Sequence, residues 1–373
     1  MRQFRIFLSV LPALLLSLAS TTAYAHRVEA ENAQGVTIYY DYKYTDNGTE
    51  LEVTYQGSSS YSQYNEYSGE VVIPESVTYN GTTYPVTGIG LSAFAESDVS
   101  SVTIPSTVTD IGYGSFSGCA KLTGVDIPNT VTTLKSEAFF NCSQLESVTI
   151  GSGVTTISQY AFAYCPKLKE ITIPNTVTTI EHDAFYQCTG LASVVIGSGV
   201  TTIGTSAFYV CDNLTSVTIL RQDPPSLEGY TDFTFSNRAN ATLYVPYGCK
   251  SNYQSVDYWK EFNEIRELPQ PQLPTPTITY ADGKLTFADE VEGVTFNYGI
   301  YQGYEQTTSS TEPIVFPFNP VYIVQALAKK EGWRNSGIAE ITVDLSDLKG
   351  DANGDGIISI ADITIILENI LNQ

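Results

Sequence analysis

The chain has 373 residues, of which 42% are hydrophobic and 16% charged, and its 40 acidic against 18 basic residues give a formal net charge of −22. This excess of acid argues against nucleic acid or anionic lipid as a partner, because binding phosphates requires clustered cations. Two histidines cannot build a multi-histidine metal site, and six cysteines are too few for a disulfide-dense fold of this length.

The N-terminus has the pattern of a secretory signal. An apolar stretch from 7 to 18 follows two arginines and is too short to span a membrane. Ala23-Tyr24-Ala25 is a small-x-small cleavage site, so the mature chain is expected to begin near His26. We therefore predict that residues 1–25 are a signal peptide and that the protein is secreted or lies at the cell surface, without a membrane span after cleavage. An uncleaved anchor is the alternative.

Residues 26–69 are predicted to form an N-terminal β cap. Alternating apolar residues at 35–40 and 51–55 fit the two strands of a hairpin. Such a hairpin would cover the open first coil of the repeat array that follows it.

A 23-residue repeat occupies residues 70–220. A segment with the pattern x-Val-x-Ile-Pro, or a close variant, begins at Ser101 and returns every 23 residues through Ser216, with an earlier degenerate copy from Glu70. Because the apolar residues alternate, each copy is predicted to be a short strand with Val and Ile inward. Seven such strands side by side would form a parallel sheet roughly 30 Å long. An Ala-Phe pair in most units is predicted to form a short helical turn or an irregular corner that buries the Phe.

A single unit of this kind cannot bury its own apolar face, whereas stacked coils cover one another. The unit resembles the leucine-rich repeat of the BspA-like class, which occurs in bacterial surface proteins and some protist proteins. The resemblance implies an α/β-type leucine-rich-repeat solenoid, mostly β with parallel strands, and a role as an adhesin that holds host proteins or other cells. A C-terminal cap is expected at 221–268, where an alternating segment at 241–246 precedes aromatic residues at 253 and 258–262.

One cysteine recurs in each of five coils. The row is either a set of disulfides or metal-binding thiols, or a buried column of small apolar residues. Its odd number cannot pair fully within itself, and no Cys-x-x-Cys motif or histidine partner accompanies it, which favours the buried column. The row consists of Cys119, Cys142, Cys165, Cys188 and Cys211, and Cys249 lies outside it.

A second module is predicted after the repeats. Four prolines within 269–276 indicate a stiff linker. Short strand-like segments separated by turns over 277–345 predict a small β-sandwich similar to fibronectin-type or immunoglobulin-like modules. Its aromatic residues could stack on sugars or pack in the core of the module. These residues are Tyr298, Tyr301, Tyr304 and Trp333.

Residues 346–373 contain a twelve-residue loop with the spacing of a calcium site. Calcium is the expected cofactor, because this set of hard oxygens suits no transition metal. The loop and the amphipathic helix after it resemble a dockerin repeat, which implies docking to a cohesin-like module. A full dockerin has two such loops and this chain shows one, so a calcium-stabilised cap on the preceding module is the alternative. The predicted ligands are Asp351, Asn353, Asp355, the carbonyl of Ile357, Ser359 and Asp362.

Two surfaces are candidates for binding. One is the outward side of the strands, which is small and mostly hydroxylic; the other is an aromatic stripe after the Ala-Phe corners. The alternatives are a solvated β-face and inward-packed rings. The strand-face candidates are Ser101, Thr103, Asp126, Ser147, Thr149, Glu170, Thr172, Ser193, Ser216 and Thr218. The stripe candidates are Phe140, Tyr164, Tyr186 and Tyr209.

No catalytic constellation is visible in the sequence. His182 is the only histidine beyond the mature terminus, and it lies at a variable repeat position where a solvated side chain is expected. We therefore predict an exported, non-catalytic protein whose solenoid binds an extracellular or host protein or a cell-surface glycan. The alternative is a dockerin-tethered accessory or scaffold subunit of an extracellular polysaccharide-degrading assembly.

Overall fold

The structure is a computed structural model. The chain forms two compact units, Met1–Leu268 and Pro269–Gln373, and each unit is described by itself. The predicted signal peptide and the predicted calcium loop lie outside the described residues. Within the ranges that the structure describes, no helix is long and apolar enough to cross a membrane. These ranges are 28–55, 67–270, 272–281, 284–288, 291, 294–302, 305–308, 321–330 and 333–344.

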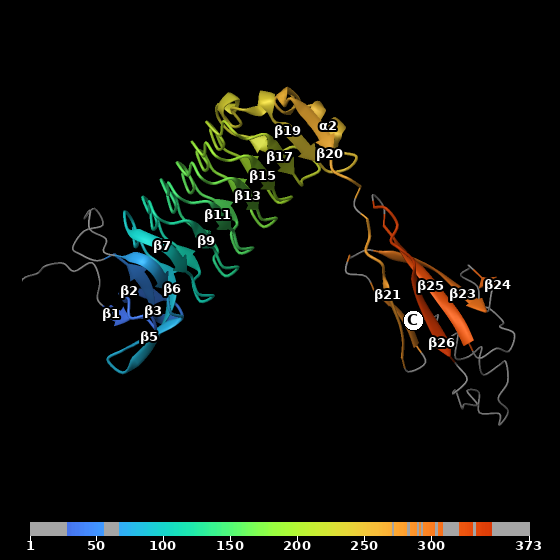
Figure 1. The fold of residues 1–373 in the computed structure, drawn as a ribbon, viewed down its shortest axis with the longest axis horizontal. Coiled ribbons are helices and arrows are strands. Elements are labelled where there is room, and N and C mark those ends of the chain that lie inside the picture. Colours follow the sequence, from blue (N-terminus) through green and yellow to red (C-terminus); the bar gives the residue numbers. More distant parts are fainter. Residues whose placement is uncertain are drawn as a thin grey trace, which may run out of the picture. The chain divides into compact units, whose positions relative to one another are not determined.

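An antiparallel meander forms the N-terminal end of the first unit. β1 (Val28–Glu31) pairs with β2 (Thr37–Thr45), and β2 forms the predicted hairpin with β3 (Gly48–Thr54). β3 then pairs in parallel with β6 (Thr82–Ile89), whose other end forms a hairpin with β5 (Ser76–Tyr79). Parallel pairing continues from β6 into the coils, so the cap and the first repeats share one sheet (Figure 1).

The predicted Val-x-Ile strands are present, and their apolar side chains point inward. Ile171 pairs with Val194 and Val194 with Val217, so the register repeats every 23 residues. The expected single seven-stranded sheet is wrong, because backbone pairing breaks between the fourth and fifth of these strands. The first group is β4 (Ser68–Val72), β7 (Asp98–Thr103), β9 (Gly124–Asp126) and β11 (Ser147–Thr149). The second is β13 (Glu170–Ile173), β15 (Ser193–Ile196), β17 (Ser216–Ile219), β19 (Thr242–Val245) and β20 (Glu264–Glu267).

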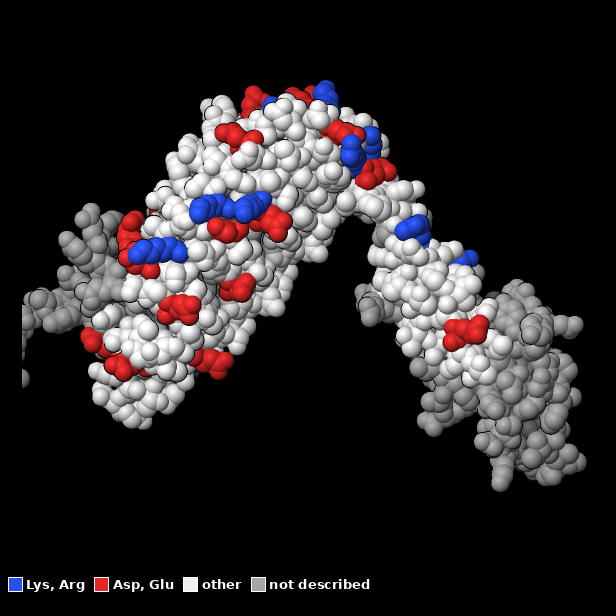
Figure 2. Space-filling view, in the orientation of Figure 1, with Lys and Arg blue, Asp and Glu red and all other residues white. Residues whose placement is uncertain are grey.

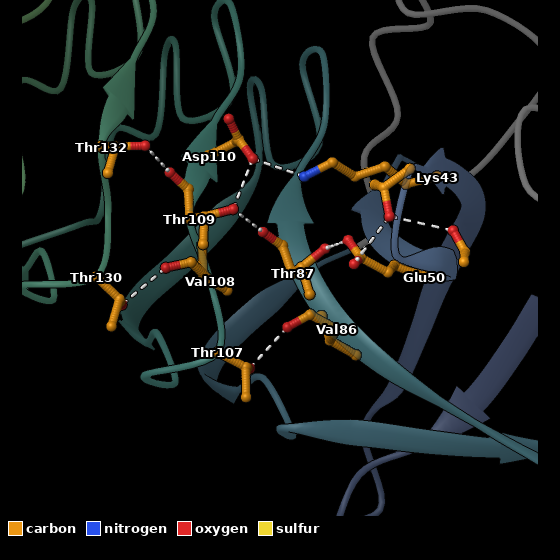
Figure 3. Close-up of polar contacts among 12 residues, drawn as sticks. Lys43, Glu50, Val86, Thr87, Thr107, Val108, Thr109, Asp110, Thr130 and Thr132 are labelled. Atoms are coloured by element: carbon orange, nitrogen blue, oxygen red, sulfur yellow. Dashed lines mark hydrogen bonds and ion pairs between the residues drawn. The ribbon is translucent and has the colours of Figure 1, made fainter.

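A second row of two-residue strands, not predicted from the sequence, runs along another side of the coils. The first five strands each contain the inward Ile or Leu that follows the repeat's second Val by three residues, and the sixth contains the partly buried Leu227, three residues after Pro224. Threonine hydroxyls link the coils further, as where Thr132 donates to the Thr109 carbonyl at 3.4 Å and Thr130 to the Val108 carbonyl at 2.9 Å (Figure 3). The strands are β8 (Asp110–Ile111), β10 (Thr133–Leu134), β12 (Thr156–Ile157), β14 (Thr179–Ile180), β16 (Thr202–Ile203) and β18 (Ser226–Leu227).

Polar contacts fasten the N-terminal cap to the first coils (Figure 3). Lys43 Nζ of β2 lies 2.6 Å from Asp110 Oδ2 of β8, and the Thr109 hydroxyl donates to the same oxygen at 2.7 Å. Thr87 Oγ1 of β6 donates to Glu50 Oε2 of β3 at 2.6 Å. The cap is therefore joined to the solenoid by side chains as well as by the shared sheet.

The Phe of each coil belongs to a continuous stack in the core. Consecutive ring centroids lie 4.7–5.4 Å apart, with ring planes within 8° of parallel. The corners that carry these rings are irregular turns rather than helices. Burying one such side chain stabilises the fold by about 1.5–3 kcal/mol. The stack consists of Phe94, Phe116, Phe139, Phe162, Phe185, Phe208 and Phe235, all of them fully buried.

The cysteine row is a buried column of free thiols that also donate hydrogen bonds. Cys119 Sγ donates to the Phe94 carbonyl of the preceding coil at 3.0 Å. Because that carbonyl also accepts a backbone N–H, the thiol uses its second lone pair. Burial raises the pKa of Cys119 and Cys211 to about 12, so both stay protonated. The buried-column interpretation is confirmed for all five residues of the row, and Cys142, Cys165, Cys188 and Cys211 donate in the same way to Phe116, Phe139, Phe162 and Phe185.

Two types of coil alternate at the turn after the Val-x-Ile strand. Ile-Pro-Asn-Thr-Val at 127–131 is followed by Ile-Gly-Ser-Gly-Val at 150–154, and the same pair of sequences recurs in the next two coils. Asn129 Oδ1 accepts the backbone N–H of Ser152 at 2.9 Å. A Cβ atom on Gly153 would lie 2.3 Å from the Asn129 carbonyl oxygen. The second coil type therefore needs glycine because its backbone approaches the preceding coil too closely for a side chain.

The C-terminal cap extends the Val-x-Ile sheet and closes the phenylalanine stack. β19 pairs in parallel with β17, and β20 with β19. The ring of Trp259 stacks on Phe262 at 5.9 Å and 10°, and both rings contact Phe235. The predicted aromatic residues of this segment therefore do cover the last coil. The cap's helical elements are η2 (Thr231–Phe233), η3 (Arg238–Asn240), α2 (Lys250–Gln254) and η4 (Trp259–Glu261).

The second unit consists, in its described residues, of two antiparallel sheets. Part of the predicted linker packs on this unit, since Leu273 is buried and its N–H donates to the Arg334 carbonyl at 3.1 Å. The sandwich arrangement stays a prediction. One sheet is β21 (Thr277–Ala281) with β22 (Lys284–Ala288). The other, in spatial order, is β24 (Glu305–Thr308), β23 (Thr295–Gln302), β25 (Val321–Lys329) and β26 (Ala339–Asp344).

Candidate binding surface

Aromatic side chains outside the core follow one another along the solenoid from coil to coil. The centroid distances between consecutive rings are 5.2, 5.3, 5.9 and 5.1 Å, and the planes are tilted by 32° to 81°. We call this set the aromatic ladder; it consists of Phe140, Tyr164, Tyr186, Tyr209 and Phe233. The predicted stripe is thus present as one contiguous row of rings, and it extends one residue farther than predicted.

Local backbone geometry places the rings in this row. Tyr186 and Tyr209 directly follow a buried Phe of the stack, and so does Phe140. Tyr164 is displaced by one residue, because the small and fully buried Ala163 follows the stack Phe in that coil. With φ at 60°, Tyr164 adopts a left-handed conformation, and its ring still meets Phe140 and Tyr186. The ladder is therefore continuous although its sequence spacing is irregular.

Phe233 was missed by the sequence analysis. It ends η2, two residues before Phe235, the last member of the buried stack. The ring of Phe233 meets Tyr209 at 5.1 Å, and the side chain is 44% exposed. Thr234-Phe235 is the counterpart of the Ala-Phe pair, but Phe233 precedes this pair whereas the other ladder rings follow theirs, so the repeat pattern does not reveal it.

The ladder is partly exposed and uncharged. Its other four members are half-buried rather than packed in the core. Partial burial raises the pKa of Tyr164, with smaller contributions from Tyr186 and Asp183, so its hydroxyl is neutral at physiological pH. Cation–π contacts among the described residues involve the rings of Tyr258 and Trp333 and no ring of the ladder. Figure 2 shows that charged side chains are scattered on the visible face of this unit, with large uncharged areas between them.

The predicted strand-face residues all point away from the core. Six are exposed, namely Thr103, Asp126, Ser147, Thr149, Glu170 and Thr172. Four are half-buried, namely Ser101, Ser193, Ser216 and Thr218. The side chains of this surface are small and mostly polar, apart from half-buried Val195 between Thr172 and Thr218 and half-buried Tyr244 next to Thr218. The surface therefore offers hydrogen bonds to a ligand but little apolar area.

Other candidate features are modest. A shallow hollow of about 380 Å³ lies at the start of the C-terminal cap, lined by Ser198, Leu220, Arg221, Gln222 and Asp223. His182 is exposed, as expected, and its Nδ1 lies 3.1 Å from Asp183 Oδ2. No group of three or more His, Cys, Asp and Glu side chains within the described ranges could hold a metal ion.

Several predicted site residues cannot be compared with the structure. The calcium ligands Asp351, Asn353, Asp355, Ile357, Ser359 and Asp362 lie outside the described residues, and so does Tyr304. Tyr298 and Tyr301 lie on β23. Lys330 Nζ lies 5.5 Å from the ring centroid of Trp333, so a cation covers part of that ring.

Several solved structures are similar to this chain over about three fifths of its length. Solved structures with similar folds include a leucine-rich cell surface protein from Faecalibacterium prausnitzii, at 24% identity and a TM-score of 0.39, covering 64% of this chain and 72% of that one. A leucine-rich repeat protein from T. pallidum matches at 24% identity with a TM-score of 0.47, and the match covers 61% of this chain and 97% of that one. The pneumococcal vaccine antigen PcpA matches at 15% identity with a TM-score of 0.28, and the match covers 62% of this chain and 96% of that one. No curated protein matches the sequence.

The family comparison agrees with the coil geometry. Residues 87–215 and 155–263 match the model of the BspA type leucine rich repeat region, in six copies. The matched residues contain the phenylalanine stack, the cysteine column and the parallel strand rows except β4 and β20. The repeat part of this chain is therefore similar to the BspA type leucine rich repeat region.

Proposed function

We propose that the protein is an exported, non-catalytic binding protein of the cell surface, and that the aromatic ladder of its solenoid contacts an extracellular or host protein or a cell-surface glycan. The observation that carries this proposal is the ladder itself, five touching rings that remain partly open to solvent. Rings that served only to stabilise the coils would bury more surface by pointing inward, as the stacked Phe side chains do.

The solenoid suits this role because it presents equivalent positions in successive coils. A ligand that extends along several coils can meet one ring in each of them. Weak contacts of this kind add up along an extended ligand, so affinity does not require a deep pocket. The signal-like segment at 1–25 supports export, and the match to BspA-type repeats supports a place at the cell surface.

Binding of the labelled mature chain to a panel of cell surfaces and extracellular proteins tests the proposal. We expect Tyr186→Ala to weaken the strongest interaction, and a strand-face variant, Thr149→Lys with Thr172→Lys, to leave it unchanged. Both variants keep the buried stack, and circular dichroism verifies their folding. Loss of binding in the strand-face variant alone would assign the function to the other surface. Equal binding by all three proteins would contradict the proposal.

A second candidate function rests on the loop from Asp351 to Asp362. We propose that it binds one calcium ion and, through its likeness to a dockerin repeat, recruits the chain to a cohesin-like module of a polysaccharide-degrading assembly. Titration calorimetry of the mature chain with calcium should give one site, which Asp351→Ala combined with Asp355→Ala removes. Cohesin capture that needs calcium would favour this role. Unchanged calcium binding in the double variant would show that the loop is not the site.

A further inference from the structure

The spacing of the aromatic ladder restricts the kind of polymer that can follow it. Its rings succeed one another at 5.1–5.9 Å along the stack of coils. The spacing is imposed by the fold, because parallel pairing of β13, β15 and β17 holds neighbouring coils about 4.8 Å apart. A ligand that contacts every ring must therefore repeat its own chemistry at nearly the same interval.

Extended polypeptides do not match this interval, whereas an α-helix, with a pitch of about 5.4 Å, does and is distinguished from a glycan by the competition experiment below. An extended peptide returns the same face only every second residue, about 6.6 Å along the strand. A polyproline II helix does so every third residue, at about 9.3 Å. After two or three rungs, either chain would be out of step with the ladder. In a linear, equatorially linked polysaccharide, one sugar advances the chain by roughly the length of one pyranose ring, which is close to the step between rungs.

The chemistry of the ladder agrees with its spacing. Aromatic faces carry negative charge density, and the axial C–H bonds of a pyranose are weakly positive, so the two attract each other much as the edge of one ring attracts the face of another. In the buried stack, ring planes within 8° of parallel cover both faces of each interior ring. The ladder rings, in contrast, keep part of their surface open to solvent. Hydroxyls of Tyr164, Tyr186 and Tyr209 can exchange hydrogen bonds with sugar hydroxyls.

The electrostatics select a neutral glycan over an acidic one. Asp183 raises the pKa of Tyr160 and Tyr164, after the larger effect of burial, so its carboxylate acts on this part of the ladder. Among the described residues, no cation–π contact brings a cation to a ladder ring. An anionic sugar would therefore meet like charge at Asp183 and no cation stacked on a ladder ring.

We propose that the aromatic ladder is a binding track for a neutral, linear, equatorially linked glycan that lies along the solenoid with one sugar per coil. This rests on the proposed function and names its ligand class. The track spans five rings, so affinity should grow with oligosaccharide length up to about five sugars and then level off.

Calorimetry of the mature chain with neutral β-linked gluco- and manno-oligosaccharides, from disaccharide to heptasaccharide, tests this. We expect Tyr186→Ala to weaken binding about tenfold, the loss equivalent to one aromatic contact. Tyr186→Phe should retain most of the affinity because it keeps the ring. Tyr247→Ala, which removes a 51% exposed tyrosine outside the ladder, should change nothing.

Two results would overturn the glycan assignment and leave the proposed function standing. One is cell-surface binding that needs Tyr186 but is neither matched nor competed by any of the oligosaccharides. The other is competition by an α-helical or basic peptide and not by sugars, which would assign the ladder to a protein segment. Cell-surface binding that persists unchanged in Tyr186→Ala would contradict the proposed function itself.

Discussion

Each regular coil holds two residues in the left-handed region, one on either side of its buried Phe. In the last coil of this type they are Ser206 and Val210, both with φ at 57°. This conformation is unfavourable for any residue with a side chain and least favourable for a β-branched one. Asn141 occupies the position equivalent to Val210 three coils earlier, with φ at 56°, and asparagine tolerates the left-handed region well. The backbone at Val210 is therefore more strained than the backbone at Asn141, which has the same conformation.

Exchanging these two side chains tests the strain. We expect Val210→Asn to raise the free energy of unfolding by about 1 kcal/mol, and the reverse change Asn141→Val to lower it by a similar amount. The midpoints of urea-induced unfolding measure both effects. If Asn141→Val did not change the urea midpoint, the left-handed backbone conformation would not affect the free energy of unfolding.

Two acids at the junction between the N-terminal cap and the coils have opposite pKa shifts. Burial raises the pKa of Asp110, but hydrogen bonds from Lys43 and Thr109 outweigh it, so the net shift is downward. Burial raises the pKa of Glu52, and Lys43 offsets this only in part. Ionised Asp110 therefore stabilises the fold above its unfolded pKa of about 3.9, and this is lost as the pH falls. Ionised Glu52 instead costs stability above its unfolded pKa of about 4.3.

Neutral variants should separate the two effects. At pH 7 we expect Asp110→Asn to destabilise the protein and Glu52→Gln to stabilise it, each by about 0.5–1 kcal/mol because both groups are partly exposed. At pH 3 the effect of Glu52→Gln should be close to zero, since the raised pKa leaves Glu52 protonated in both states. The cost of Asp110→Asn should be smaller than at pH 7 and should keep falling as the pH drops through the lowered pKa of folded Asp110. Urea midpoints at the two pH values measure this. The same sign for both variants at pH 7 would contradict the assignment of these contacts.

The sequence predicts those elements whose residues recur in every 23-residue repeat, and it predicts the others less well. The Val-x-Ile strands, the inward Phe and the cysteine column follow from the 23-residue period, because each repeats in register. The two-residue strands were missed because too few residues alternate to reveal a strand. The thiol hydrogen bonds and the approach at Gly153 depend on distances between coils, which no single unit encodes. In the ladder, Tyr164 was identified despite its displaced position, whereas Phe233 was hidden in a segment assigned to the cap.

At the scale of the whole solenoid, the contacts form a chain of neighbours. Phe162 stacks on Phe139 at 5.3 Å and on Phe185 at 5.4 Å, and its backbone N–H donates to the Ala184 carbonyl of the next coil. In such arrays stability is the sum of coil and interface terms, so a weakened interface in the middle can uncouple the two ends. Each end here has its own cap, with β1 to β3 at one and β19 and β20 at the other.

We therefore expect Phe162→Ala to lower stability by about 3–5 kcal/mol and to split the unfolding of the solenoid into two transitions. Phe233→Ala, the same change in a partly exposed ring of the ladder, should cost less than about 1 kcal/mol and keep one transition. Urea unfolding followed by circular dichroism, with hydrogen exchange compared between residues 98–149 and 170–219, measures both. A single transition for Phe162→Ala, shifted no more than that of Phe233→Ala, would contradict this view. In that case the hydrogen-bonded strand rows, and not the stacked rings, would couple the coils, because only the strands would still connect the two halves of the solenoid at position 162.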